Sequence, residues 1–447
     1  MTEISSSEAV STKYKRIAEL AKKMPNAVLW SLSHHIDVAW LKEAYRRTRK
    51  DGAKGIDGQS ADEYAKELER NLQSLLDRAK SGAYRAPPVR RVHIPKGDGQ
   101  TRPLGIPTFE DKVLQRAVAM LLEAVYEQDF LDCSYGFRPE RSAHQALSKL
   151  RDTMMEMGGG WALEVDIRRY FDTIDHEHLR TVLRQRIGDG VVLRLIGKWL
   201  NAGVMERGEL SYPEAGTPQG GVISPMMANI FLHSVLDTWF ESEVKPRLRG
   251  RAELVRFADD FVIAFEREDD ARRVNEVLPK RFEKYGLMLH PDKTRLVPFR
   301  RPPYSKDDDG TTKGSAQGTF DLLGFTLYWA RSERRYWVIR LKTARDRFTR
   351  TLRRLNEWCR RNRHQPVSEQ SKKIGRALVG HFAYFGVIGN QGRLLALRRA
   401  VYRIWRSWLN RRSQRSRVTW ARMKAICDRY PLPQLPEPRS LRALAKP

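Results

Sequence analysis

The sequence is short of cysteine and of long apolar runs. Only three cysteines occur in 447 residues, and no two of them lie close together. This spacing excludes a Cys-x-x-Cys zinc site and a disulfide framework, and it is typical of a reducing compartment. No apolar run reaches the roughly 18–20 residues of a membrane span, and the N-terminus lacks the apolar core of a signal peptide. The sequence therefore predicts a cytoplasmic protein with no membrane partner.

Acidic residues are scarce in the last quarter of the chain. Residues 331–447 hold 31 Lys and Arg against 6 Asp and Glu, a net charge of +25, whereas residues 1–330 carry only +3. Such an excess is typical of a surface that binds a polyanion, most simply nucleic acid. A basic tail that is merely solvated is the alternative. Several of the eleven Trp lie in this region and favour a folded domain.

Between residues 35 and 330, helical spacing of apolar residues alternates with short β-branched runs. This pattern predicts a mixed α and β domain. Ser60, Ser142 and Asp175 each precede a helical pattern and are expected to cap it. Besides the helix after Ser142, the expected helices are 34–47, 60–78, 111–126, 176–186, 191–201, 224–239 and 270–285. The expected strands are 89–94, 101–107, 161–167, 287–290 and 323–329.

Both ends of the chain differ from this region. Residues 1–34 are polar and then mildly amphipathic, and we expect a loosely attached leader. Beyond residue 330, two stretches place apolar residues three or four apart and fill the other faces with Arg. This pattern is typical of amphipathic helices packed on one another. We expect an all-helical domain over 331–430 and a tail over 431–447.

Two adjacent carboxylates, Asp259 and Asp260, lie between two short apolar runs within 254–265. The runs predict a hairpin with both acids at its tip. Neighbouring like charges flanked by residues that favour burial are costly without a cation, and hard oxygen ligands suit Mg²⁺. Asp166 ends the expected strand 161–167. If that strand lies beside the hairpin, the three carboxylates can hold two Mg²⁺ ions about 3.5–4 Å apart. A polar turn between ordinary strands is the alternative.

Three segments resemble motifs of reverse transcriptases, and they occur in the order that those enzymes have. Residues 163–175 are similar to motif A, 216–225 to motif B, and 257–260 to motif C. Phe257 stands where Tyr is more usual in motif C. This substitution is conservative and leaves every carboxylate in place.

Further segments resemble the reverse transcriptases encoded by group II introns in particular. These are 94–107 and 135–139. Residues 381–387 together with Asn390 resemble the maturase, or thumb, domain of the same proteins. The resemblance runs from about residue 35 to about 425. Many of these proteins end in a zinc-dependent HNH endonuclease. Because cysteine pairs are absent and the sequence ends soon after the maturase-like part, we expect the form that lacks it.

This resemblance implies both a fold and a function. The fold would be an α+β right-hand polymerase, with fingers and palm at 35–330 around an antiparallel sheet and an all-helical thumb or maturase domain at 331–430. The function would be RNA-directed DNA synthesis joined to intron RNA binding that assists splicing and mobility. The implied partners are intron RNA, an RNA template, a DNA primer or target, and deoxynucleoside triphosphates. The location would be bacterial-type cytoplasm, associated with RNA and the nucleoid.

The resemblance also implies a metal site. Asp166, Asp259 and Asp260 would be catalytic and would hold two Mg²⁺ ions, with Mn²⁺ as a possible substitute. The main-chain carbonyl of Ile167 would assist. Neighbours on a hairpin need not both face the ions, which makes Asp260 the weakest member. Asp172 is interpreted as structural rather than as a ligand.

Other residues match substrate contacts of the family. Lys96 and Arg102 would grip the incoming triphosphate, and a solvated hairpin is the alternative. Phe171 would exclude a ribose 2′-hydroxyl, where a core phenylalanine is the alternative. Gln219 would contact the nascent base pair, although an ordinary Gly-Pro turn gives the same sequence. Lys293 would lie near the pyrophosphate leaving group.

The basic region supplies the expected RNA contacts. Arginines off the apolar stripes are not needed for packing, and we expect them to bind RNA: Arg345, Arg353, Arg354, Arg403, Arg411 and Arg412. Tyr384 and Trp405 are expected to hold helices together rather than stack on bases. Two other functions stay open. A non-catalytic splicing factor is disfavoured by the intact carboxylates. A free-standing reverse transcriptase of a defence or diversity-generating system is disfavoured by the maturase-like region.

Overall fold

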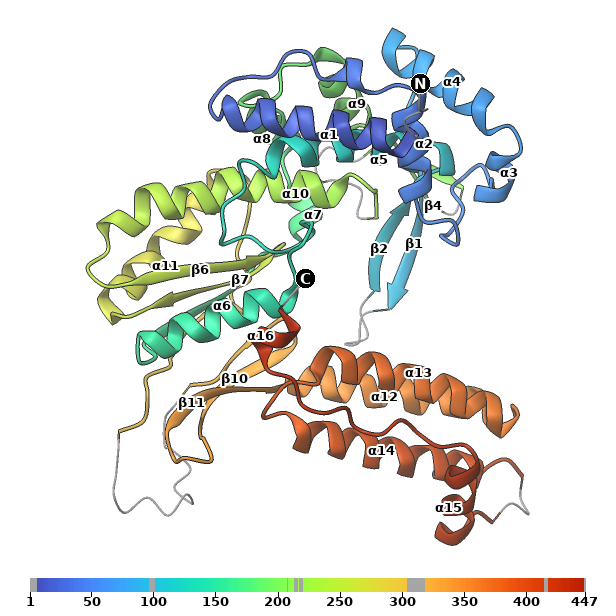
Figure 1. Cartoon of the computed structure of the whole chain (residues 1–447), viewed down its shortest axis with the longest axis vertical. Coiled ribbons are helices and arrows are strands. Elements are labelled where there is room, and N and C mark those ends of the chain that lie inside the picture. The colour runs from blue at the N-terminus through green and yellow to red at the C-terminus, as the bar shows by residue number, and fades with distance from the viewer. Residues whose placement is uncertain are drawn as a thin grey trace.

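The computed structural model describes residues 6–95, 101–206, 208–212, 216, 220–303, 318–413 and 417–445. Figure 1 shows helices from the first part of the chain at one end and a helical bundle from the last quarter at the other. A sheet flanked by helices lies between them. A hairpin from the first part extends toward the bundle (Figure 1).

The N-terminal helices surround one central helix, α5 (Phe109–Tyr126), which is buried along most of its length. Helices α1 (Ser6–Lys23) and α2 (Val38–Arg47) pack against it. The hydroxyl of Tyr14 on α1 donates to Glu123 over 3.1 Å, and Ile17 is fully buried. The expectation of a loosely attached leader is therefore wrong for residues 6–23, because α1 has an apolar face that α5 covers.

The helix expected over 60–78 is broken into α3 (Ala61–Ala65) and α4 (Leu68–Ser81). Ser60 caps α3 with a reciprocal bond to Glu63, as its position predicts. The chain then forms the hairpin of β1 (Val89–Pro95) and β2 (Thr101–Ile106).

This hairpin belongs to a four-stranded sheet of order β2-β1-β4-β5. Strand β4 (Val204–Glu206) runs parallel to β1, and β5 (Glu209–Ser211) is antiparallel to β4. Ile94 and Arg102 face each other across the two long strands. The sheet ties the hairpin to the segment that precedes the motif B loop.

The central sheet is antiparallel, with the order β6-β7-β3-β8. It contains β3 (Trp161–Asp166), β6 (Ala252–Phe257), β7 (Asp260–Phe265) and β8 (Arg295–Pro298). The antiparallel hairpin around Asp259 and its neighbour strand β3 are confirmed. The strand expected at 287–290 is wrong. That segment makes a single bridge between Ile167 and Leu289, and the pairing resumes as β8.

Helices cover both faces of this sheet (Figure 1). One face contacts α11 (Glu268–Glu283) and joins the core that contains α10 (Ser224–Leu232), while α6 (Ala143–Glu156) covers the other. Ser142 and Asp175 cap the helices that follow them, as expected. The remaining elements of this part are η1 (Ser33–His35), α7 (Tyr170–Thr173), α8 (His176–Arg184), α9 (Gly190–Leu200), η2 (His233–Thr238), η3 (Phe240–Val244) and η4 (Lys245–Arg247).

The last quarter begins with a small antiparallel sheet, β9 (Phe320–Leu322), β10 (Phe325–Arg331) and β11 (Trp337–Thr343). The expected all-helical start at residue 331 is wrong, because alternating burial along 337–343 makes this segment a strand. The helices that follow are α12 (Arg345–Arg361), α13 (Val367–Phe385), α14 (Gln391–Leu409), α15 (Trp420–Arg429) and α16 (Leu441–Leu444).

Two buried clusters hold the molecule together. The first joins the N-terminal helices to one face of the central sheet, and the second joins the opposite face to β9–β11 and the last helices. Trp405 is fully buried in the second cluster, and its indole N–H donates to Gln370 over 2.9 Å. Its expected role in packing is confirmed. None of the helices in the described ranges is both long and apolar enough to cross a membrane.

Candidate active site

Asp166 and Asp260 lie opposite each other across the ladder between β3 and β7. Residues paired in this way project from the same face of a sheet, so both carboxylates are on one side. Asp259 occupies the turn that joins β6 to β7. Ala258 just before it has a φ of 58°, which is uncommon for a residue with a side chain. The three predicted acids thus meet at one end of the central sheet.

The ionised forms of Asp259 and Asp260 are disfavoured in this arrangement. Burial, followed by the charges of Asp259, Glu164 and Asp166, raises the pKa of Asp260 to about 7. The pKa of Asp259 is also raised, first by burial and then by Asp166, while Arg102 and Arg256 oppose the increase. Concentrated negative charge of this kind favours a cation, and carboxylate oxygens are the ligands that Mg²⁺ prefers.

The carboxylates are not arranged as a closed metal site. Among the residues that the structure describes, no three His, Cys, Asp or Glu side chains are close enough to hold an ion. Asp166 instead accepts a bond from the ammonium of Lys293 over 2.6 Å. Asp260 accepts a bond from the main-chain N–H of Leu323 over 3.4 Å. The donor set suits a divalent cation, but Asp166 must exchange its present partner to bind one.

Ile167 immediately follows the β3 acid. The main-chain bonds across to the 288–290 segment use the carbonyl of Asp166 and the N–H of Arg168. The predicted metal-binding carbonyl of Ile167 takes no part in these two bonds. Its side chain is buried, which fixes the backbone at this point.

A buried arginine holds the turn before Asp259. Arg256 is fully inaccessible to solvent, and its guanidinium forms a bidentate ion pair with the equally buried Asp237 at 2.7 and 2.5 Å. It also donates to Asn229, to Ser134 and to the carbonyl of Ala258, the last over 3.0 Å. Every N–H of the guanidinium therefore has a partner, and one of those bonds fixes the strained residue next to Asp259.

A second link connects the site to the last helices. The hydroxyl of Tyr384 on α13 donates to the carbonyl of Leu323 over 2.9 Å. Leu323 has a φ of 53°, and its N–H is the donor to Asp260. This β9–β10 turn therefore lies between a catalytic candidate and the helical bundle. Tyr384 holds elements together, as expected.

The other predicted substrate residues have different surroundings. Arg102 is exposed on β2, and its charge acts on Asp259. Phe171 is half-buried in α7, with its ring 5.4 Å from that of Tyr170. Lys96 and Gln219 lie outside the described residues.

Gly216 and Gly220, in the motif B segment, each lie close to the backbone of another segment. Gly216 donates its N–H to the carbonyl of Ile174 over 2.9 Å, and a Cβ at Gly216 would lie 2.9 Å from the carbonyl oxygen of Phe171. Gly220 has a φ of 112°, and a Cβ there would lie 2.7 Å from the carbonyl oxygen of Gly105. Only glycine fits such close backbone contacts. The loop is therefore anchored between α7 and β2.

A groove lined by arginines leads from Asp260 to the helical bundle. Its walls include Asp260, Pro95 at the end of β1, and residues of α12 and α13. The cations along it are Arg347, Arg350, Arg353, Arg354 and Arg376. Such a lining suits a nucleic-acid backbone.

The groove contains only Arg353 and Arg354 of the six arginines predicted to bind RNA. Arg345, Arg403 and Arg411 are exposed outside its lining. Arg412 donates to the carbonyls of His364 and Gln365, so the expectation that packing does not use it is wrong.

Several residues of this site were not predicted from the sequence. Arg347 and Arg350 lie at helical spacing from the predicted Arg354, which would have grouped all three on one face. The position of Arg256 inside an apolar strand was a visible sign of a buried ion pair. The partner Asp237 and the Tyr384–Leu323 link join segments far apart in the chain and leave no local signal.

A sequence model of the family described as reverse transcriptase (RNA-dependent DNA polymerase) matches residues 94–327, more than half of the chain. The chain belongs to this family. Protein YkfC of Escherichia coli (strain K12) is 38% identical over 255 residues, which cover 50% of this chain and 67% of YkfC.

Within the family, the resemblance to group II intron proteins is confirmed. Group II intron-encoded protein LtrA of Lactococcus lactis subsp. cremoris is 43% identical over 276 residues, which cover 59% of this chain and 45% of LtrA. Nuclear intron maturase 2, mitochondrial, of Arabidopsis thaliana is 27% identical over 233 residues, covering 43% of this chain and 30% of that protein. The matched part thus spans less than half of each of these two relatives.

Proposed function

We propose that this protein is an RNA-directed DNA polymerase with a right-hand arrangement, in which the groove between the hairpin and α12–α13 receives the template and primer. The observation that carries the proposal is the position of Asp166, Asp259 and Asp260 at one end of the central sheet, together with the place of Asp260 in the lining of that groove. Carboxylates at the end of a basic channel suit phosphoryl transfer.

In this mechanism, Asp166, Asp259 and Asp260 would hold Mg²⁺, with the Ile167 carbonyl as a further oxygen. When bound, Mg²⁺ supplies activation of the primer 3′-hydroxyl and neutralises charge on the transferred phosphoryl group. Arg102 and Lys96 would grip the triphosphate through their positive charges. Lys293 releases Asp166 and places its positive charge near the pyrophosphate.

The remaining residues select and position the substrates. Phe171 occupies the space of a ribose 2′-hydroxyl and so favours deoxynucleotides. Gln219 contacts the nascent base pair. The groove arginines, including Arg354 and Arg376, neutralise phosphates of the duplex.

Primer extension on an RNA template with deoxynucleotides tests this proposal. Asp259→Asn and Asp166→Asn should each lower the rate by at least about 10³-fold, because each removes a ligand whose charge stabilises the transition state. Template affinity should change little. Asp62→Asn, an exposed acid on α3, is the matched control. Extension by the Asp259 variant at near the native rate would refute the metal-site assignment.

We further propose that the chain binds intron RNA and assists splicing and mobility. The supporting observation is the exposed cationic surface of α14 and the residues after it, including Arg403 and Arg411, which lies outside the catalytic groove. A filter-binding comparison of intron RNA with an unrelated structured RNA tests it. Equal affinity for both would favour a free-standing polymerase, and so would a gene that lies outside any intron.

A further inference from the structure

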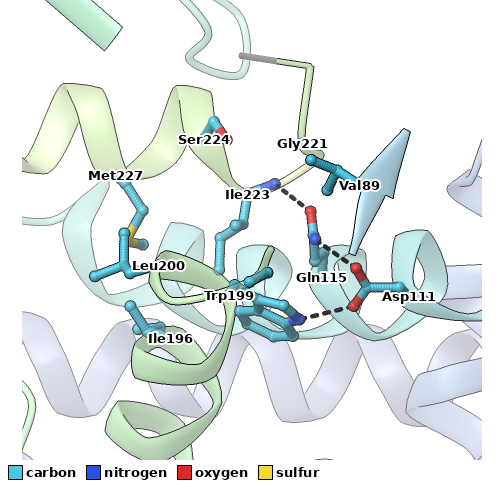
Figure 2. A pocket seen from close by; sticks show the side chains of 11 residues that line it. Val89, Asp111, Gln115, Ile196, Trp199, Leu200, Gly221, Ile223, Ser224 and Met227 are labelled. Atoms are coloured by element: carbon cyan, nitrogen blue, oxygen red, sulfur yellow. Dashed lines mark hydrogen bonds between the residues drawn. The ribbon is translucent and has the colours of Figure 1, made fainter. Parts of the chain in front are cut away.

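Gln115 on α5 holds the end of the motif B loop through main-chain bonds. Its side-chain carbonyl accepts the N–H of Val222 over 2.8 Å and that of Ile223 over 3.4 Å. Helix α10 begins just after these residues and has no cap from its own side chains. Figure 2 shows Gln115 between Asp111 and the start of this helix. A residue of another helix thus satisfies the N–H groups that precede α10.

Asp111 fixes the orientation of the Gln115 amide. Its Oδ2 accepts the Gln115 NH₂ over 3.0 Å, and its Oδ1 accepts the indole N–H of Trp199 over 2.7 Å (Figure 2). The hydroxyl of Tyr84 also donates to Oδ1. An ionised carboxylate only accepts hydrogen bonds. Because the NH₂ group must face Asp111, the amide oxygen must face the loop.

The network is shielded from water. Asp111 and Gln115 are 2% and 3% exposed. A flipped amide would place its NH₂ against two main-chain N–H groups and leave them unpaired in the interior, which is costly. The loop's other end is held in a similar way, since buried His176 bonds through Nε2 to the carbonyl of Gly216 over 2.6 Å.

We infer that Gln115, oriented by Asp111, is a positioning residue for the loop that carries Gln219 and thereby sets the fit of the nascent base pair. The inference rests on the proposed polymerase function. It means that nucleotide selection depends partly on α5, the helix whose Gln115 bonds to the end of the loop. Gly220, two residues before Val222, lies close to the backbone of Gly105 on β2, the strand that carries Arg102.

Steady-state primer extension on RNA with Gln115→Met tests this role. Methionine keeps the length, but its thioether sulfur is only a weak acceptor for the loop N–H groups. The KM for the deoxynucleotide and the misincorporation frequency should each rise by about ten-fold, the cost of losing the acceptor of the 2.8 Å bond from Val222, while kcat changes far less. Gln73→Met, at an exposed position on α4, should match the native protein. A KM and an error frequency equal to the native values would overturn the inference.

A double variant that exchanges the amide and the carboxylate between positions 115 and 111 tests whether the orientation of the Gln115 amide matters, or only its packing. Gln115→Glu alone sets two carboxylates against each other and should be impaired. When Asp111→Asn is added, the amide at position 111 can donate to the carboxylate at position 115. That carboxylate then accepts the loop N–H groups with its other oxygen. The double variant should recover at least half of the lost selectivity. If it is as impaired as the single variant, Asp111 does not orient residue 115, and this outcome refutes the inference even when Gln115→Met does not fold. A native protein that extends no primer would instead refute the proposed function.

Discussion

The ammonium of Lys293 forms an ion pair with Oδ2 of Asp166 over 2.6 Å, so a cationic side chain already lies at a carboxylate proposed to bind metal. The two side chains are 61% and 35% exposed. An ion pair this accessible to water contributes at most about 1 kcal/mol. Lys293 therefore competes with a divalent cation for Asp166, but only weakly.

Lys293→Met should strengthen Mg²⁺ binding by up to about five-fold, because the competing ammonium is removed. It should also slow nucleotide addition, since the positive charge near the leaving group is lost. Calorimetric titration of Mg²⁺ measures the first effect and single-turnover extension the second. Lys284→Met, an exposed lysine after α11, is the control. Weaker Mg²⁺ binding by the Lys293 variant would show that the ammonium supports the ion rather than displacing it.

Phe171→Ala should admit ribonucleotides. The side chain is half-buried beside Tyr170. Removing the ring should relieve the proposed clash with a ribose 2′-hydroxyl without breaking a hydrogen bond. Selectivity for deoxynucleotides over ribonucleotides should fall by about ten-fold, a cost typical of one overpacked contact. Competing incorporation opposite the same template base measures it. Tyr212→Ala, at an exposed aromatic residue, should leave the ratio unchanged. An unaltered ratio in the Phe171 variant would make this residue part of the core only.

Replacing Arg403 and Arg411 together with Ala should weaken binding of intron RNA and flatten its salt dependence by about two phosphate contacts, each worth roughly 0.7–0.9 in log–log slope. Both side chains are exposed. Arg412 is unsuitable, because its bonds to the 364–365 carbonyls would be lost as well. Lys22 and Lys23 on α1 offer a control with equal charge. If replacing Lys22 and Lys23 weakened RNA binding as much as replacing Arg403 and Arg411, the RNA would be held by overall charge and not by a defined surface.

His381 should make the fold sensitive to acid. Burial, followed by Arg354, lowers its pKa to about 4. The unfolded chain takes up this proton near pH 6.5 and the folded chain only near pH 4, so stability is lost as pH falls between these values, by about 3 kcal/mol in total.

His381→Phe should remove most of that loss. Its Nε2 has no hydrogen-bond partner among the described residues, so the substitution breaks no bond at that atom. Urea unfolding at pH 7 and pH 4.5 measures the difference. A loss equal to that of the native protein would assign the acid sensitivity to other groups.

Local patterns predicted most of the central sheet. Alternating and fully apolar runs identified β3 and the hairpin around Asp259, because one or both faces of these strands are buried. Caps at Ser60, Ser142 and Asp175 were also readable, since a cap depends on neighbours within one turn. The carboxylates lie at one end of the sheet because β3 pairs with β7. The sequence made this pairing plausible but contains no local signal that fixes it.

What was missed depends on pairing between distant segments. Strand β11 carries Arg and Lys on one face and reads as part of a basic helical region, yet its pairing with β10 makes it a strand. Likewise, α1 is only mildly amphipathic, and its attachment depends on packing against α5, about a hundred residues further along the chain. The bonds of Gln115 reach across 107 and 108 residues, a separation over which periodicity carries no information.

The second buried cluster limits how this protein can be divided. It contains Val262 and Ala264 from the central sheet together with Leu378 and Trp405 from the last helices. Cutting the chain near residue 330 would strip β11 from β10 and expose one face of the sheet that bears the carboxylates. The C-terminal helices are therefore not an exchangeable module. A chimera with a relative's bundle must import the matching half of this interior, or the part that carries the central sheet will lose solubility along with the surface proposed to bind RNA.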